Sequence, residues 1–361
     1  MRIVLATPAA EAGGVWKHVL DLAAGFQQRG HQVTVALPPG AEPRMTEAAD
    51  RLGLRAAPLQ ESRSLQADVW HLHLPKSLEW GALKWMAGAR RVRGRATIVT
   101  EHLPRVPATD PTLPWDPGVV LGRAKPGAAL AKTALKKAML LPADRVIAVS
   151  EHSRRFLLSR YGLRPERVVA VPNGVVPPEV VEPVPDPEGV LRVLSVGALH
   201  FRKGYDVLLD AAALSSGTWS VSVIGEGREM EAIRARAAEL PRTSVDLLGW
   251  RPDAARAAEA AHVLCLPSRS EAMPYSVLEA MACGRAVVAS AVDGVPELVE
   301  DGVTGLLVPP DDPSALAAAL DRLDKDRAAV LEMGAAGRAR LLSRFTLETM
   351  LESTLRVYES A

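Results

Sequence analysis

Short apolar runs alternate with amphipathic stretches along most of the chain, a pattern typical of parallel α/β structure. In the first half, the runs that predict strands are Ile3–Thr7, Gln32–Leu37, Asp68–Leu72, Ala96–Thr100, Val146–Val149 and Val168–Val171. Apolar residues at helical spacing predict helices between them, at Val15–Arg29, Leu78–Arg90 and Glu151–Tyr161. Because strands separated by helices pair in parallel through right-handed crossovers, we expect an open, doubly wound sheet.

The second half repeats this plan after a proline-rich connector. Five of the twelve residues 176–187 are proline, which predicts a stiff segment outside sheet and helix. Strands are then predicted at Arg192–Val196, Ser220–Ile224, Val245–Leu248, Val263–Leu266, Ala286–Ala289 and Gly305–Val308. Helices are predicted near Tyr205–Leu214, Glu229–Ala238, Ala254–Ala260, Val277–Cys283, Pro313–Leu323 and after Arg327. We therefore expect a first domain over residues 1–177, a hinge over 178–190 and a second domain over 191–345.

Composition agrees with two soluble domains. The 361 residues are 48% hydrophobic and 24% charged, which excludes disorder, and their number exceeds what one core usually serves. No uncharged apolar run reaches the roughly eighteen residues of a membrane span, and the short apolar start is typical of a first strand rather than a signal peptide. The two cysteines, Cys265 and Cys283, indicate neither a disulfide framework nor a metal site. We expect a cytoplasmic enzyme.

Charge divides unevenly between the halves. Residues 1–177 hold 25 basic and 14 acidic residues, a net charge of +11, whereas the remainder carries −10. A basic half favours an anionic partner, or simply attracts the acidic half. Lys125, Lys132 and Lys136 recur at helical spacing, which predicts either a peripheral helix at the inner membrane surface or a solvated helix face. Aromatic residues do not interleave with these charges, so nucleic acid ranks last among the partners.

Two features of the first half bear candidate chemistry. Gly13 and Gly14 follow the first strand and open a helix, where backbone amides can approach an anion, although no GxGxxG fingerprint is present. His102 follows the strand at 96–100, at the carboxyl end where open sheets bind ligands. We interpret His71 and His73 as structural, because we expect them to face opposite sides of their strand and not to chelate together.

The stronger signals lie in the second half. Arg202 and Lys203 stand between a strand that ends in glycine and the start of a helix, where they can neutralise a diphosphate. Glu271 lies in the loop after the strand 263–266, and Glu279 follows eight residues later within an apolar helix. The start of that helix, 275–277, offers backbone amides to a phosphate, and the two carboxylates can accept hydrogen bonds from sugar hydroxyls.

Several of these segments together resemble glycosyltransferase family 4. They are Val196–Lys203, the Glu271–Glu279 pair, Val171–Val175, Ala291–Val299 and Gly305–Val308. The resemblance covers most of the chain and is strongest over 146–310. It implies a GT-B fold, in which two Rossmann-like domains face each other across a deep cleft, the first binding the acceptor and the second the sugar nucleotide. It also implies transfer with retention of configuration, and a C-terminal helix, 346–361, that packs back on the first domain.

The resemblance assigns roles to individual residues. Arg202 and Lys203 would bind the donor diphosphate, Glu271 the transferred sugar, Glu279 the ribose, and His102 would lie beside the sugar. Gly13 and Gly14 would border the diphosphate and the acceptor. Other residues expected around the nucleotide are Gly197, Trp250, Arg251, Met273, Pro274, Tyr275, Ser276 and Val277. Weaker candidates for the acceptor site are Trp115, in the proline-rich loop 104–127, and Glu101 and Ser150.

We expect no metal or other cofactor. The one DxD triplet, 324–326, falls in an amphipathic helical pattern where alternate residues diverge, so Arg202 and Lys203 would replace a metal ion. No carboxylate is placed as a nucleophile, which favours front-face attack with the leaving phosphate taking the acceptor proton. A uridine nucleotide is expected from frequency alone. The acceptor is expected to be an anionic or lipid-linked glycan precursor, or a small natural product; the sequence sets no oligomeric state.

Three other functions compete with sugar transfer. An epimerase or phosphorylase would share the fold, but a phosphorylase would need a lysine-bound cofactor, for which the sequence has no distinct sign. A nicotinamide-dependent oxidoreductase is disfavoured by the missing dinucleotide fingerprint. A non-catalytic subunit that only binds sugar nucleotides is disfavoured because all the donor-site residues are present.

Overall fold

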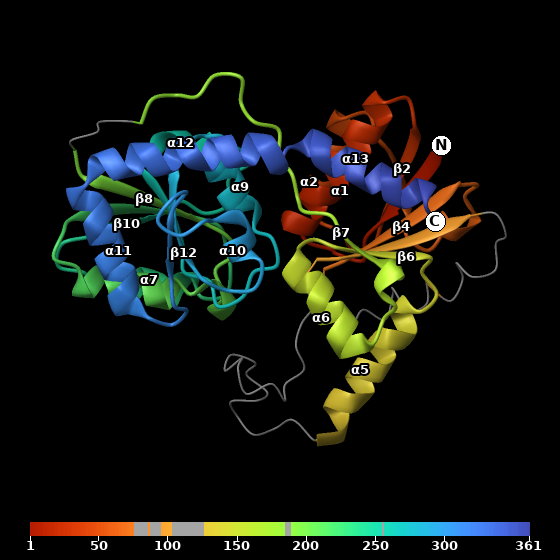
Figure 1. The fold of residues 1–361 in the computed structure, drawn as a ribbon, viewed down its shortest axis with the longest axis horizontal. Coiled ribbons are helices and arrows are strands. Elements are labelled where there is room, and N and C mark those ends of the chain that lie inside the picture. Colours follow the sequence, from red (N-terminus) through yellow and green to blue (C-terminus); the bar gives the residue numbers. More distant parts are fainter. Residues whose placement is uncertain (76–85, 87–94, 103–125, 185–188, 255) are drawn as a thin grey trace. The chain divides into compact units, whose positions relative to one another are not determined.

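Two parallel β-sheets, one from each half of the chain, form the frame of the protein (Figure 1). The computed structural model describes residues 1–75, 86, 95–102, 126–184, 189–254 and 256–361. The chain divides into a first unit of Met1–Asn173 with Leu347–Ala361, and a second unit of Gly174–Thr346.

The sheet of the first unit has seven strands in the order β3-β2-β1-β4-β5-β6-β7. They are β1 (Arg2–Ala6), β2 (Gln32–Leu37), β3 (Arg55–Pro58), β4 (Val69–Leu74), β5 (Ala96–Glu101), β6 (Arg145–Ala148) and β7 (Val168–Ala170). Alternate residues of β1 enter different cores. Ile3 and Leu5 pack in one hydrophobic cluster, whereas Val4 and Ala6 pack in another. The sheet is therefore buried on both faces, as parallel sheets usually are.

Helices cover both faces of this sheet. They are α1 (Gly14–Gln28), α2 (Pro43–Arg51), α5 (Pro126–Leu140), α6 (Glu151–Tyr161) and α13 (Leu347–Glu359), with short 3₁₀ turns η1 (Ser62–Ser64) and η2 (Pro165–Arg167). Apolar residues of α1, α2 and α13 share the cluster of Ile3 and Leu5, and those of α5 and α6 share the other. The last helix thus completes the core of the first unit, so it belongs there although it is last in sequence.

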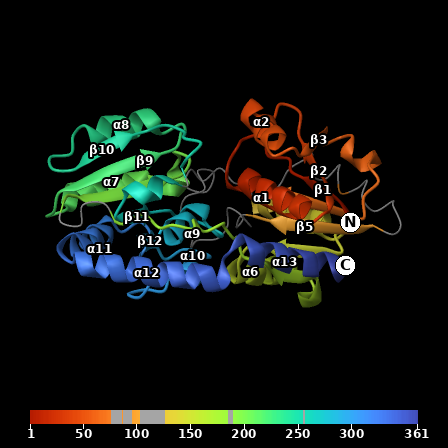
Figure 2. The ribbon, with the colours of Figure 1, turned by 90° about the horizontal axis from the view of Figure 1, so that it is seen from above.

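The second unit repeats the architecture with six parallel strands in the order β10-β9-β8-β11-β12-β13. They are β8 (Leu191–Val196), β9 (Trp219–Ile224), β10 (Ser244–Leu247), β11 (Val263–Leu266), β12 (Ala286–Ser290) and β13 (Leu306–Val308). Helices flank the sheet on both sides (Figure 2). They are η3 (Phe201–Lys203), α7 (Tyr205–Leu214), α8 (Met230–Ala237), η4 (Arg256–Ala260), α9 (Tyr275–Ala282), α10 (Val295–Leu298), α11 (Pro313–Lys325) and α12 (Arg327–Arg344). None of the helices in the described ranges has the length and apolarity needed to cross a bilayer.

The elements differ from the sequence prediction in a few places. Strand β3 and helix α2 were not predicted, because Arg55–Pro58 has little apolar alternation and Pro43–Arg51 is strongly polar. The helix predicted at 254–260 is the 3₁₀ segment η4. The helix predicted at Leu78–Arg90 and the loop predicted at 104–127 lie almost wholly outside the described residues.

The proline-rich segment after Val175 is tied to the second unit rather than standing free. The Arg285 guanidinium, buried in the second unit, donates to the carbonyl oxygens of Glu182 and Pro183 at 2.9 and 3.4 Å. Arg338 donates to the carbonyl oxygen of Pro178 at 2.9 Å. The division between the units accordingly falls between residues 173 and 174, before the predicted hinge at 178–190.

The two points where the chain passes from one unit to the other lie side by side. Val175, just after the first crossing, forms a parallel bridge with Thr346, just before the second. The Val175 amide also donates to the carbonyl oxygen of Phe345 at 3.1 Å. The chain therefore enters and leaves the second unit at one place.

Candidate active site

A loop at the carboxyl end of β8 carries the two predicted phosphate-binding cations. The strand ends at Val196, Gly197 follows, and Arg202 and Lys203 close the 3₁₀ turn η3 before α7 begins. The Lys203 side chain lies so close to Gly197 that a β-carbon at this position would be 3.0 Å from Lys203 Cε. The hydroxyl of Tyr205 donates to the Gly197 carbonyl oxygen at 2.9 Å, which fixes the loop from the α7 side. A glycine at 197 thus gives the lysine room to lie against the backbone.

Both cations converge on Glu271, in the loop that follows β11. Lys203 Nζ donates to Glu271 Oε1 at 2.5 Å, and Arg202 Nη1 lies 3.4 Å from Oε2. Arg202 Nη1 also donates to the carbonyl oxygen of Ser270 at 2.7 Å. The three charged side chains are between 8 and 18% exposed, so their charges interact with little screening by water. The structure brings together three of the four residues that the sequence analysis predicted as catalytic.

The electrostatics of this group favour an ionised carboxylate with excess positive charge around it. Burial alone would raise the pKa of Glu271, but the charges of Lys203 and Arg202, with hydrogen bonds from Lys203 and Ser268, lower it to about 2. Burial lowers the pKa of Lys203, against the raising effect of Glu271. One carboxylate neutralises only one of two cations, which leaves a net positive charge suited to an anion.

The depressed pKa of Glu271 predicts how pH acts on stability. A carboxyl group with a pKa of about 2 in the folded chain and 4.5 when unfolded stabilises the fold by about 3 kcal/mol above pH 5. This stabilisation is lost as the pH falls from 4.5 toward 2, because the carboxyl group becomes protonated. We expect Glu271→Gln to lower the free energy of unfolding, measured with urea, by about this amount at pH 7 and by progressively less below pH 4.5. A difference between the two proteins that stays constant with pH would contradict the assignment.

Three further residues hold this group in place, and the sequence analysis did not single them out. Ser268 Oγ donates to Glu271 Oε1 at 2.9 Å. Asp293 Oδ2 accepts from the Glu271 amide at 2.8 Å and from Ser270 Oγ at 2.6 Å. The buried Arg269 guanidinium pairs with Asp206 and Asp311 at 2.7 and 2.6 Å, and stacks on the Phe201 ring. It therefore joins the β11 loop to η3 and α7. Asp293 is distinguished locally by a positive φ of 45°. A backbone angle cannot be read from the sequence, so this feature could not have identified the residue beforehand.

Helix α9 begins directly after this loop, as predicted. Its N-cap is Pro274, which supplies no side chain to cap the first turn. The other predicted nucleotide contacts here, Met273, Pro274, Tyr275 and Val277, are buried, whereas Ser276 and Glu279 are half-buried. The side chains of the buried residues pack inside the second unit. Glu279 lies one turn inside the helix, where the spacing predicted it.

Trp250 and Arg251 follow β10, and neither joins the Arg202–Glu271 group. The Trp250 side chain is exposed, and Arg251 pairs with Asp253 at 2.8 Å. Both lie after the carboxyl end of their strand, the edge at which β8 and β11 also end. Their contact with a nucleotide base stays a prediction.

In the first unit, α1 starts at Gly14 with Gly13 as its N-cap, and both glycines are exposed. His18, one turn into α1, is buried and packs against two other histidines. Its ring centroid lies 4.6 Å from that of His102 and 5.2 Å from that of His73. His102 follows the end of β5 and is 9% exposed. The sequence analysis assigned no function to His18, which lies in the same cluster as His102.

The expectation that His71 and His73 face opposite sides of β4 is wrong. Residues two apart in a strand point to the same face, and the two ring centroids are 4.0 Å apart. His71 is structural, since its nitrogens contact the Tyr358 hydroxyl and Thr100 Oγ1, both at 2.6 Å. His73 instead contacts His102.

Two weak acceptor candidates prove to be packing residues. Glu101 is fully buried and forms an ion pair with the equally buried Lys136 of α5. Ser150 is also fully buried, and its hydroxyl caps α6 by accepting from the Ser153 amide at 3.1 Å. Neither side chain faces solvent, which corrects the expectation that they meet an acceptor. The third candidate, Trp115, lies outside the described residues.

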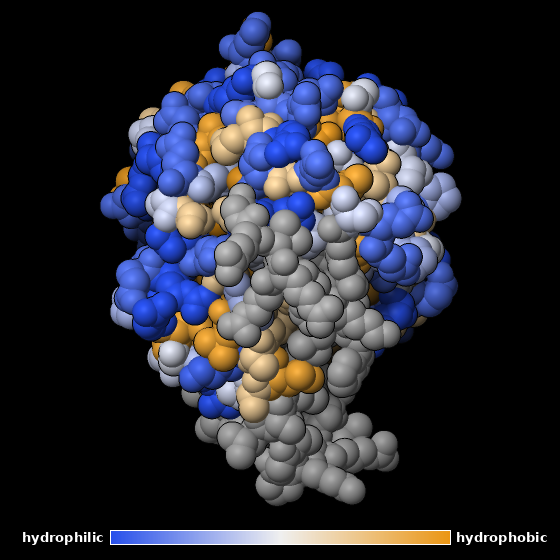
Figure 3. Space-filling model, turned by 90° about the vertical axis from the view of Figure 1, so that its right-hand side faces the viewer, coloured by the Kyte–Doolittle hydropathy of each residue, from blue (hydrophilic) through white to orange (hydrophobic). Residues whose placement is uncertain are grey.

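The burial of Lys136 also corrects the prediction of a basic helix face over 125–136. A lysine that neutralises a buried glutamate offers no charge to a lipid surface. Lys125 and the side chain of Lys132 lie outside the described part of the chain. On the face shown in Figure 3, hydrophilic side chains predominate and apolar ones form small separate groups.

The DxD triplet 324–326 lies at a helix junction rather than within one helix. Helix α11 ends at Lys325, and Asp326 caps α12 by accepting from the Ala329 amide at 3.0 Å. Asp324 pairs with Arg327 at 2.8 Å. Each aspartate thus has a local structural partner.

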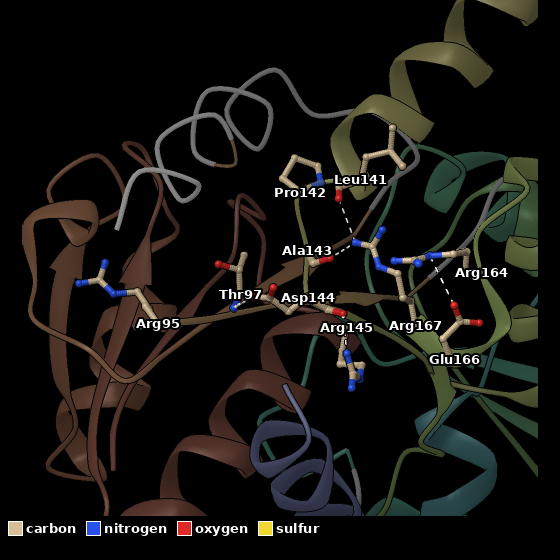
Figure 4. Close-up of a pocket in the computed structure, with 10 residues that line it drawn as sticks. All are labelled: Arg95, Thr97, Leu141, Pro142, Ala143, Asp144, Arg145, Arg164, Glu166 and Arg167. Atoms are coloured by element: carbon tan, nitrogen blue, oxygen red, sulfur yellow. Dashed lines mark hydrogen bonds and ion pairs between the residues drawn. The ribbon is translucent and has the colours of Figure 1, made fainter. Parts of the chain in front are cut away.

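A pocket of about 520 Å³ lies at the opposite edge of the first sheet from His102, beside the amino ends of β5 and β6 (Figure 4). Four of its lining residues are Arg95, Arg145, Arg164 and Arg167. Arg95 donates to two backbone carbonyl oxygens, at 3.0 and 2.9 Å, and Arg167 likewise holds the carbonyl oxygens of Leu141 and Ala143. Arg95 and Arg167 thus join loops to one another, and the pocket is not part of the candidate active site.

Comparison with known proteins places the chain in a family. Residues 12–177 match the model described as Glycosyltransferase Family 4, and residues 191–326 match that of Glycosyl transferases group 1. A phosphatidyl-myo-inositol mannosyltransferase of Mycobacterium leprae is 30% identical over an alignment of 371 positions, gaps included, that covers 96% of this chain and 93% of the relative. An alpha-maltose-1-phosphate synthase of Mycobacterium tuberculosis is 30% identical over an alignment of 403 positions, gaps included, that covers 99% of each chain.

Solved structures confirm the fold. HepE of Anabaena, in complex with UDP, matches with a TM-score of 0.80 at 18% identity over 100% of both chains. The sucrose-phosphate synthase of Thermosynechococcus elongatus matches with a TM-score of 0.76 at 21% identity, over 100% of this chain and 99% of that one. The predicted architecture of two Rossmann-like α/β domains, the GT-B fold, is therefore confirmed. The chain belongs to the group 1 glycosyltransferases of family 4, and it is a transferase.

Proposed function

We propose that this enzyme transfers a sugar from a UDP-sugar to a hydroxyl group of a phosphate-bearing acceptor, with retention of configuration and without a metal ion. The observation that carries the donor half is the convergence of Arg202 and Lys203 on the buried, ionised Glu271. UDP is favoured as the nucleotide because the structurally similar HepE is described in complex with UDP and with UDP-glucose.

The two cations supply what the bond-breaking step requires. Cleavage of the bond between the anomeric carbon and the diphosphate oxygen leaves additional negative charge on the diphosphate. Fixed positive charges at a poorly solvated site stabilise that charge and so lower the barrier. Arg202 and Lys203 are already held by Glu271, Ser270 and Gly197, so little reorganisation is needed when the charge develops.

The acceptor half of the reaction needs no carboxylate nucleophile. We propose that the acceptor hydroxyl attacks the anomeric carbon from the face that the diphosphate leaves, forming the new C–O bond. Its proton passes to the departing phosphate oxygen. Lys203, Ser268 and Arg202 already contact the Glu271 oxygens, which argues against Glu271 as a nucleophile. The remaining lone pairs of its carboxylate can accept hydrogen bonds from the sugar hydroxyls. Glu279 keeps its predicted role at the ribose and His102 at the sugar.

A phosphate-bearing acceptor is supported by charge and by the names of relatives. Residues 1–177 carry a net charge of +11. The relatives include the phosphatidyl-myo-inositol mannosyltransferase and, at 28% identity over 98% of this chain, a D-inositol 3-phosphate glycosyltransferase of Geodermatophilus obscurus. Basic residues near an acceptor raise its local concentration and orient its phosphate.

Thermal unfolding with nucleoside diphosphates tests the donor site. UDP at 100 times its dissociation constant is expected to stabilise the fold by about 2.7 kcal/mol, which raises Tm by roughly 5–10 °C. GDP, ADP and dTDP at the same concentration are expected to give smaller shifts. EDTA is expected to leave the UDP shift unchanged, because the proposed site uses cationic side chains in place of a metal.

The variant Glu279→Ala is expected to bind UDP at least about tenfold more weakly, a loss of about 1.4 kcal/mol. Glu231→Ala, which removes an exposed acid from α8, is the matched control and is expected to keep the full shift. Equal stabilisation of both variants would contradict the placement of the ribose at Glu279. A UDP shift that disappears with EDTA would contradict the metal-free donor site.

A further inference from the structure

Three buried histidines of the first unit form a cluster that the proposed transfer uses only in part. His18 comes from α1, His73 from the end of β4, and His102 from the residue after β5. One ring nitrogen from each lies within 4.8 Å of the others. The carboxyl ends of neighbouring parallel strands meet at one edge of the sheet, so β4 and β5 bring His73 and His102 together there.

The nitrogen–nitrogen distance between His73 and His102 suits a tetrahedral metal ion. His73 Nδ1 lies 3.3 Å from His102 Nε2. Two nitrogen ligands at about 2.0–2.1 Å from a tetrahedral zinc ion are about 3.3–3.4 Å apart. The same separation is long for a hydrogen bond between two imidazoles.

His18 is oriented as a metal-binding histidine usually is. Its Nδ1 lies 3.0 Å from the Asn173 side-chain oxygen. Because an amide oxygen only accepts hydrogen bonds, this contact places the imidazole proton on Nδ1, so His18 would bind an ion through Nε2. A second residue that fixes the tautomer in this way is a regular feature of zinc sites.

A fourth histidine nearby is excluded as a ligand. Both nitrogens of His71 are within hydrogen-bond distance of hydroxyl groups, those of Tyr358 and Thr100. The set is therefore three imidazoles, those of His18, His73 and His102.

We propose that His18, His73 and His102 form a site for a divalent zinc ion, bound through three imidazole nitrogens with a solvent molecule in the fourth position. The ion is not needed for transfer. Instead the ion coordinates the His102 ring, which the proposed function places beside the sugar, so zinc is expected to inhibit transfer reversibly. This inhibition rests on the proposed function, whereas the binding site does not.

Metal binding to the full-length chain, freed of metal beforehand, tests the site directly. We expect one equivalent of Zn²⁺ to be taken from a chromophoric chelator. We expect Co²⁺ at the same site to show the visible absorption of a tetrahedral ion without thiolate charge transfer, which separates the histidines from the buried Cys265 and Cys283.

Variants separate this cluster from other histidines. His73→Gln is expected to abolish stoichiometric binding, and Asn173→Ala to weaken it by about 10–100-fold, because it removes only the orienting contact. His31→Gln is the matched control in the same unit and is expected to bind as the wild type does. Thermal unfolding without metal checks that each variant folds. If His73→Gln does not fold, the wild-type Co²⁺ spectrum and Asn173→Ala still decide the question.

Two results would overturn the proposal: no uptake of one equivalent of Zn²⁺ by the wild type, or equal uptake by the wild type and a folded His73→Gln variant. Inhibition is measured separately, as loss of transfer with Zn²⁺ and its recovery with EDTA. If no transfer is found with any donor, the proposed function fails while the binding result still stands. If transfer occurs and bound zinc leaves it unchanged, only the inhibitory effect is refuted.

Discussion

Replacing both Arg202 and Lys203 by alanine is expected to lower kcat/KM for sugar transfer by at least about 1,000-fold, or about 4 kcal/mol of transition-state stabilisation. These two side chains supply the positive charge next to Glu271, and removal of a single such group from an active site typically costs 100- to 1,000-fold. The measurement is release of nucleoside diphosphate in the presence of an acceptor. Full turnover in the double variant would overturn the proposed stabilisation of the leaving group.

The same substitutions also affect stability, so folding and chemistry must be separated. Without its two partners, Glu271 is a buried and uncompensated carboxylate, which costs about 3–5 kcal/mol. Adding Glu271→Gln to the double variant removes that charge. We expect the triple variant to recover most of the lost stability and none of the lost activity.

A matched control removes a guanidinium of the same unit from a different setting. Arg234 on α8 pairs with Glu231 at the surface, where it is 56% exposed. Ion pairs of this kind contribute little, so Arg234→Ala is expected to leave kcat/KM and Tm nearly unchanged. A comparable loss of activity in this control would mean that net charge, rather than the Arg202–Lys203 position, accounts for the effect.

Replacing Gly204 by alanine is expected to have the largest effect on stability of any change to the candidate site that removes no charge. Gly204 has a φ of +67°, which disfavours any residue with a β-carbon. That β-carbon would also lie 2.9 Å from the carbonyl carbon of Pro267 and closer still to its oxygen. Strain and overlap together are expected to lower the free energy of unfolding by about 3 kcal/mol, or Tm by roughly 10 °C.

Gly302 provides the control that isolates the overlap. It has a similar φ of +75° in the same unit, but a β-carbon there would meet nothing within 4 Å. Gly302→Ala is expected to lower the free energy of unfolding by only about 1 kcal/mol, the strain of placing a residue with a β-carbon at a positive φ. Equal losses in the two variants, measured by thermal unfolding, would contradict a close approach of η3 to Pro267. Because Gly204 directly follows Lys203, its substitution is also expected to weaken UDP binding.

Sequence patterns predicted the strands that carry the site because those strands are apolar and are bounded by turn residues. The end of β8, the loop after β11 and the start of α9 at Tyr275 all fall where the pattern indicated. These are local properties, since hydrophobic period, glycine and helix starts are encoded within a few residues. The convergence of Arg202 and Lys203 on Glu271 follows from them, because both loops leave the same edge of one sheet.

The residues that escaped prediction act through contacts between distant segments. Arg269 joins Asp206 to Asp311, more than 100 residues apart in the chain, and nothing near Arg269 in sequence indicates either partner. Lys136 looks like a surface lysine by its spacing, yet it neutralises Glu101 in the core. His18 and Asn173 are 155 residues apart. Partners of this kind are set by the tertiary fold, which periodicity does not describe.

The adjacency of Val175 and Thr346 makes the second unit an insertion with neighbouring ends. Segments whose ends meet in space can be exchanged between proteins without stretching either host. Residues 174–346 therefore form a segment that can be exchanged as one piece between family members. Recombination at these two positions would leave the first unit, with its C-terminal helix, intact. Under the proposed function, such an exchange is expected to change the sugar that is transferred and not the acceptor.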